Sequence, residues 1–154
     1  MRLAHIIFLL SALLLFIPTL TAPYLAHLGH ENLSELNYRL YATACHQRPE
    51  RSFHVYGHKM AVCARCFGVY LGMALGALLY PLVWRRGDMP SRWIILAALT
   101  PLALDGGTQL LGLRESTNWL RAATGLLFGA AVPYYLIPAF EAVLRELKPF
   151  YTPP

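Results

Sequence analysis

Four long apolar stretches constrain this chain more than any other feature of its sequence. They cover about residues 6–26, 60–84, 93–113 and 119–143 and contain very few charged side chains. A helix needs roughly 20 predominantly apolar residues to cross a bilayer. The sequence therefore predicts an all-α fold, an integral membrane bundle of about four transmembrane helices that forms a single domain over residues 1–154.

The overall composition supports a membrane protein. Hydrophobic residues make up 56% of the 154 residues and charged residues 14%, which is outside the usual range of soluble globular domains. The formal net charge is +5, but the basic residues stand singly or in pairs between apolar stretches, so we expect no nucleic-acid partner. The expected location is the cell membrane, with several spans and membrane lipid around them.

The first apolar stretch and the polar loop after it need separate interpretation. A basic residue before an apolar run is also typical of a secretory signal, but Pro23 and Tyr24 make a poor cleavage site, so we expect an uncleaved anchor. The polar loop covers residues 27–59. Within it, Ser34 to Ala44 has its apolar residues on one side, which predicts a short amphipathic helix at the membrane interface.

Antiparallel threading of four spans gathers the polar side chains on one membrane face. This face receives the following residues: Cys45, His46, Glu50, Arg51, Cys63, Arg65, Cys66, Asp105, Gln109, Arg114, Asn118 and Arg121. The short loop on the other face, Arg85 to Arg92, carries three positive charges, and cytoplasmic loops are enriched in Lys and Arg. We therefore expect both termini in the cytoplasm and the polar face outside.

Three cysteines and a histidine on this face suggest a metal site. Cys63 and Cys66 lie one helical turn apart at the start of a helix, where the dipole favours the thiolate that binds metals. With the cysteine and histidine of the preceding loop they make a Cys3His set that suits zinc. The four predicted ligands are Cys45, His46, Cys63 and Cys66. Two other histidines, His54 and His58, compete for the fourth position.

Two other interpretations of the cysteines stay open. Two of the three could form a disulfide that fixes the polar loop to the second span, with the third buried as a small apolar residue. Alternatively, Cys63 and Cys66 could cycle as a redox-active pair, with Cys45 as the resolving thiol. The protein would then be a membrane thiol-disulfide oxidoreductase, although the second cysteine pair usual in such enzymes is missing.

Asp105 is the charged residue placed deepest in the apolar layer. It stands about 12 Å from the end of the third span at 1.5 Å per residue. A carboxylate there is costly unless it is paired, which makes it a functional hypothesis. Gln109 lies one turn away on the same face, and Arg121, beside Asn118, is the expected countercharge. The structural alternative is an Asp105–Arg121 pair that only holds the third and fourth spans together.

Glycines at a regular spacing predict which spans pack together. Gly68, Gly72 and Gly76 recur every fourth residue, and Gly125 and Gly129 repeat the pattern. Small residues at this spacing let helix backbones approach closely. We therefore expect the second and fourth spans to be in contact, with the cysteine pair near the start of the fourth span. The same faces would permit a homo-oligomer.

The polar motifs also resemble those of a known family. Four motifs stand in order along the chain: CHQRPERSF at Cys45–Phe53, CARCFGVYLG at Cys63–Gly72, DGGTQ at Asp105–Gln109, and Arg114–Gly125. Over about Leu40 to Gly129 the chain resembles the predicted membrane proteins of domain of unknown function 2085. Phe67 departs from the pattern, where a small residue such as Thr is expected. The resemblance implies a small multispanning prokaryotic membrane protein and no particular activity.

The leading functional hypothesis joins the zinc site to the polar pocket. The predicted catalytic residues are Glu50, Asp105, Gln109, Asn118 and Arg121. With an open position the metal could activate water, Glu50 or Asp105 serving as the base. An anionic lipid headgroup or another anionic small molecule would be bound by Arg51, Arg65 and Arg114. This is the chemistry of a membrane hydrolase or transferase; with a closed metal tetrahedron, the protein would instead be a binding or scaffold element. A third interpretation is a transporter or ion-binding protein that uses Asp105 as its intramembrane carboxylate and works as an oligomer.

Overall fold

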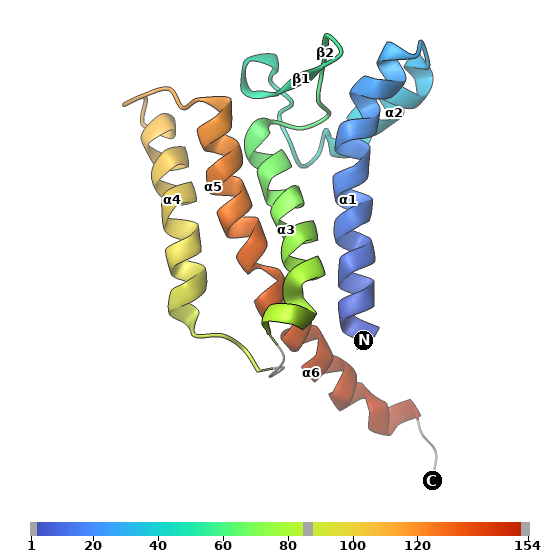
Figure 1. Cartoon of the computed structure of the whole chain (residues 1–154), viewed down its shortest axis with the longest axis vertical. Coiled ribbons are helices and arrows are strands. Elements are labelled where there is room, and N and C mark those ends of the chain that lie inside the picture. Colours follow the sequence, from blue (N-terminus) through green and yellow to red (C-terminus); the bar gives the residue numbers. More distant parts are fainter. Residues whose placement is uncertain (1–2, 85–87, 152–154) are drawn as a thin grey trace.

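The computed structural model describes residues 3–84 and 88–151, and most of these are helical (Figure 1). Four segments of the described chain are long and apolar enough to span a membrane. They are α1 (Leu3–His27), α3 (Ala64–Val83), α4 (Arg92–Leu110) and a last segment in which α5 (Asn118–Ala131) is followed by α6 (Pro133–Tyr151). The prediction of an all-α membrane bundle with four spans is confirmed.

The polar loop holds more structure than the sequence indicated. The amphipathic helix α2 runs from Glu31 to Tyr41, so it begins and ends three residues before the predicted range. A short 3-10 turn, Pro49–Arg51, and two antiparallel strands, β1 (His54–Val55) and β2 (His58–Lys59), follow it. The three residues after β2 are buried, with Ala61 and Val62 packed in one cluster with Ala22 of α1 and Tyr41 of α2, and α3 begins at Ala64, four residues later than expected.

The glycine pattern places α3 against α5, as predicted. A Cβ atom on Gly72 would lie 2.5 Å from the Leu126 carbonyl oxygen, and one on Gly129 would lie 2.9 Å from the Val69 Cα atom. Real Cβ atoms do not approach backbone so closely, so only glycine permits this contact. The two helix N-termini therefore lie side by side at the face that carries the polar loop (Figure 1).

The polar loop is fixed across the ends of these helices. On one side, Ser34 of α2 donates a hydrogen bond to the Ala22 carbonyl of α1 (2.8 Å). On the other side, the Asn118 amide at the start of α5 donates to the Ser52 carbonyl (3.1 Å). Between them, the Phe53 ring packs against Trp119 with 5.0 Å between ring centroids. The loop thus covers the N-termini of α3 and α5.

Helix α4 is the least packed part of the bundle. It lies at the edge of the molecule beside α5 (Figure 1), and Asp105 is its single buried residue. At the end away from the polar loop, the Tyr135 hydroxyl donates to the Ser91 carbonyl (2.7 Å) and accepts from the Ile95 amide (3.1 Å). At the other end, Asp105 itself makes the attachment.

Candidate functional site

Two adjoining cavities open at the face that carries the polar loop. The first, of about 460 Å³, is called the arginine cavity and is lined by Arg48, Glu50, Arg51, Gln109, Gly112, Arg114, Glu115, Ser116 and Arg121. The second, of about 350 Å³, is called the thiol cavity and is lined by Ala44, Cys45, His46, Arg48, Arg51, Cys63, Arg65, Cys66, Gln109, Leu110 and Arg121. Because four residues line both, the two cavities share a wall.

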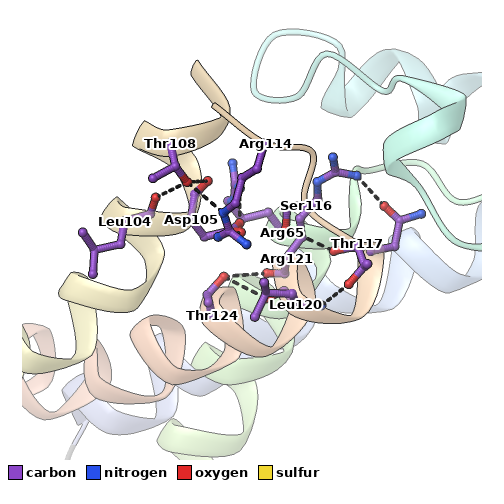
Figure 2. Close-up of polar contacts among 11 residues, drawn as sticks. Arg65, Leu104, Asp105, Thr108, Arg114, Ser116, Thr117, Leu120, Arg121 and Thr124 are labelled. Atoms are coloured by element: carbon purple, nitrogen blue, oxygen red, sulfur yellow. Dashed lines mark hydrogen bonds and ion pairs between the residues drawn. The ribbon is translucent and has the colours of Figure 1, made fainter. Parts of the chain in front are cut away.

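Asp105 lies behind this wall and holds two arginines. Its carboxylate, only 2% exposed, pairs with Arg65 of α3 and with Arg114 of the α4–α5 loop (2.8 Å) (Figure 2). The expectation that Arg121 would be the countercharge is therefore wrong. Arg65 lines the thiol cavity and Arg114 the arginine cavity, so one carboxylate orients a guanidinium in each.

The end of α4 explains why Arg114 reaches back to Asp105. Gly112 follows the helix with a φ of +70°, the left-handed conformation that reverses a chain after a helix. The Leu113 amide then donates to the Thr108 carbonyl (3.0 Å). Arg114 lies over the last helical turn, where its Nε donates to the Thr108 hydroxyl (3.0 Å).

Arg121 occupies the shared wall and is 6% exposed. One Nη atom donates to the Asn118 side-chain oxygen (2.7 Å). The other donates to the Gln109 side-chain oxygen (2.7 Å) in the amide orientation that points this oxygen, and not the nitrogen, at Arg121. Both partners are neutral. Its Nε has no hydrogen-bond partner, and within the described residues no carboxylate forms an ion pair with it. The site thus contains a buried guanidinium that pairs with no carboxylate of the described residues, although Asp105 acts on it electrostatically from a longer distance.

The three cysteines come together beneath the polar loop. Cys45 is buried, and its Sγ accepts a hydrogen bond from the Cys63 backbone amide (3.1 Å). Its side chain also contacts the Cys63 and Cys66 thiols. The hydrogen bond with Cys45, and then burial, hold the pKa of the Cys63 thiol above its ordinary value. All three are free thiols, so the disulfide interpretation does not describe this structure.

Of the other predicted site residues in the polar loop, some line the cavities and some do not. His46 is exposed but lines the thiol cavity, whereas His54 and His58 are exposed in the hairpin outside both cavities. Glu50 lines the arginine cavity. Over residues 3–84 and 88–151, no group of three or more His, Cys, Asp or Glu side chains is arranged to hold a metal ion. A Cys3His zinc site would therefore need the three thiols, as well as His46, to move into ligand geometry.

The structure adds residues that the sequence interpretation passed over. Arg48 lines both cavities, and Ser116, which is buried, donates its backbone amide to Gln109 (3.0 Å) when that amide oxygen faces it. Thr117 caps α5 by accepting a hydrogen bond from the Leu120 amide (3.3 Å) (Figure 2). All three residues stand inside the polar motifs of the sequence, and their place in these motifs was the one indication of a role. Residue type gave no further indication.

Comparison with known proteins covers the same region. The family described as predicted membrane protein (DUF2085) matches residues 45–135. An uncharacterized protein of Methanocaldococcus jannaschii is 43% identical over 156 residues, which cover 96% of this chain and 100% of the relative. An uncharacterized protein of Methanothermobacter thermautotrophicus is 43% identical over 88 residues, 55% of this chain and 77% of the relative. No solved structure matches the chain.

Proposed function

This chain belongs to the family of predicted membrane proteins with domain of unknown function 2085, and from its site we propose that it binds an anionic ligand at the wall shared by the two cavities. The observation that carries the proposal is Arg121, which is buried, charged and hydrogen-bonded only to neutral groups among the described residues. A buried charge without a countercharge is costly, so a ligand that supplies the countercharge binds favourably.

The surroundings of Arg121 favour the same kind of ligand. Arg48, Arg51 and Arg65 line the thiol cavity with it, and none of the described residues lining that cavity is acidic. The N-termini of α3 and α5 also lie at this face, and helix N-termini carry partial positive charge. Arginine binds phosphate and carboxylate groups through paired hydrogen bonds, so we propose a phosphate or carboxylate group.

Ligand titration of the purified protein tests this proposal. The full chain in neutral detergent would be titrated with inorganic phosphate and, separately, with a phospholipid, with tryptophan fluorescence as the readout, because Trp119 follows Asn118, which accepts a hydrogen bond from Arg121. We expect saturable binding of at least one probe and a loss of at least about tenfold in affinity for Arg121→Gln. Arg39→Gln is the control, since Arg39 pairs with exposed Glu35 on α2. No binding of either probe, or equal binding by Arg121→Gln, would contradict the proposal.

A second proposal, zinc binding, is favoured by the contact among the three thiols. Cys45, Cys63 and Cys66 would supply three sulfur ligands and His46, on the same cavity wall, a nitrogen, which is a set that suits tetrahedral zinc. Zinc held by the three sulfurs alone would keep an open position and supply an activated water, whereas His46 as a fourth ligand would close the tetrahedron and make the metal structural. Glu50 suits the role of base better than Asp105, whose carboxylate is already engaged by two arginines. Hydrolysis or group transfer on the bound anion would follow.

Metal analysis combined with a thiol count distinguishes zinc binding from thiol-disulfide exchange. One zinc per chain with three unreactive thiols, and three reactive thiols after chelation, is the expected result. Absence of zinc from protein purified without chelator, with three thiols that oxidise reversibly to one disulfide, would instead favour thiol-disulfide exchange among Cys45, Cys63 and Cys66.

For orientation, we propose that the termini lie in the cytoplasm and both cavities face outward. The supporting feature is the number of positive charges between Arg85 and Arg92. Arg85 and Arg86 lie outside the described residues, so this proposal rests on the sequence.

A further inference from the structure

The thiol cavity has an apolar rim beside its charged wall. Leu110, the last residue of α4, lines the cavity and is 87% exposed. Leu111, Leu113 and Trp119, which continue around the same end of the molecule, are 74%, 71% and 78% exposed. Large apolar side chains at the end of a membrane span are in contact with lipid. The cavity therefore lies where headgroups meet hydrocarbon.

Helix α4 leaves this rim open toward the bilayer. It packs along α5 and has almost no contact with α3. Asp105 is the one buried residue of α4, whereas seven residues of α3 are buried. At this end α4 meets α3 through the pairing of Asp105 with Arg65 and through Gly106, which lies against the same guanidinium. Hydrocarbon chains next to α4 would thus lie directly below the charged wall.

We infer that the anion bound in the thiol cavity is the phosphate headgroup of a membrane lipid, with the lipid chains lying along α4. Arg121 and its neighbouring arginines bind the phosphate, while Leu110 and the exposed surface of α4 contact the chains. A soluble anion would match only the charged half of this site. The inference rests on the proposed anion binding and names the source of the anion.

Lipid retention measured on the full-length protein tests the inference. Protein stripped of lipid in neutral detergent would be mixed with micelles of phosphatidylglycerol or of phosphatidylcholine with the same chains, and bound lipid would be counted by native mass spectrometry. We expect phosphatidylglycerol to be retained at least about tenfold better than phosphatidylcholine, and Arg121→Gln to remove this preference. Inorganic phosphate should compete only weakly.

A second variant reports on the apolar half of the site. Leu110→Asn should weaken phosphatidylglycerol binding, because the substitution removes a chain contact, and should weaken the binding of inorganic phosphate much less. Leu28→Asn is the matched control: Leu28 is also an exposed leucine at the end of a span, but it lines neither cavity. Since both side chains are exposed, neither substitution should unfold the protein.

The remaining outcomes would overturn the inference in distinguishable ways. If inorganic phosphate binds as tightly as phosphatidylglycerol and Leu110→Asn has no effect, the anion is soluble and only the general anion proposal stands. If Leu110→Asn changes the oligomeric state instead of lipid retention, a second copy of the chain covers α4. If neither inorganic phosphate nor phosphatidylglycerol binds, both the anion proposal and the lipid inference fail.

Discussion

At the scale of single residues, Asp105 has two opposing effects on anion binding. Its carboxylate places a negative charge next to the proposed anion site, so electrostatic repulsion alone predicts tighter anion binding by Asp105→Asn. It also orients Arg65 and Arg114, whose side chains are 28% and 43% exposed. We expect the orienting effect to dominate, giving Asp105→Asn weaker anion binding and a stability loss on the order of 2 kcal/mol, below the roughly 3–5 kcal/mol for a fully buried pair.

The matched control for this substitution is Asp88→Asn. Asp88 is exposed, lines neither cavity and stands four residues before Arg92, the first residue of α4, so the same change of charge there should alter neither stability nor binding. Tighter anion binding by Asp105→Asn would show that the carboxylate acts only through its charge.

At the scale of elements, the α3–α5 contact predicts opposite effects for one substitution at two glycines. Gly72→Ala should lower the thermal midpoint in detergent, because the new Cβ would stand 2.5 Å from the Leu126 oxygen and 2.7 Å from the Ala130 nitrogen. Gly107→Ala in α4 meets no atom within 4 Å and should raise the midpoint, since alanine in a helix is favoured over glycine by roughly 0.5–1 kcal/mol. Changes of equal sign in the two variants would remove the packing argument.

At the scale of the whole molecule, the threading predicts which loops share a side of the membrane. Cysteines introduced at the exposed positions Thr43 and Glu115 should react with an impermeant maleimide on intact cells, and one at Asp88 only after permeabilisation. The native protein, with its three clustered thiols, provides the background. Reaction of all three positions from one side would exclude the four-span threading, whereas reversed sides would leave the threading intact and overturn the proposed orientation.

The sequence by itself determined the spans, the face that gathers the polar residues and the helices that touch. A bilayer provides no hydrogen-bond partners for the backbone, so each long apolar stretch must become a spanning helix, and the alternation of direction follows. Glycines every fourth residue likewise have few explanations other than close backbone contact, and α3 and α5 meet as that pattern predicts. The gathering of Cys45, Cys63 and Cys66 at one end follows from the same threading.

Only the tertiary structure decided which of several arginines pairs with Asp105 and which guanidinium is left without an ion-pair partner among the described residues. Helical periodicity gives the face of a side chain, but five arginines lie near this carboxylate, and their long side chains reach different partners according to loop geometry. The reversal at Gly112 brings Arg114 back over α4, and the late start of α3 sets Arg65 beside Asp105. Arg121 is left with the neutral partners Asn118 and Gln109, because Arg65 and Arg114 are the two arginines that these backbone positions bring within ion-pair distance of Asp105.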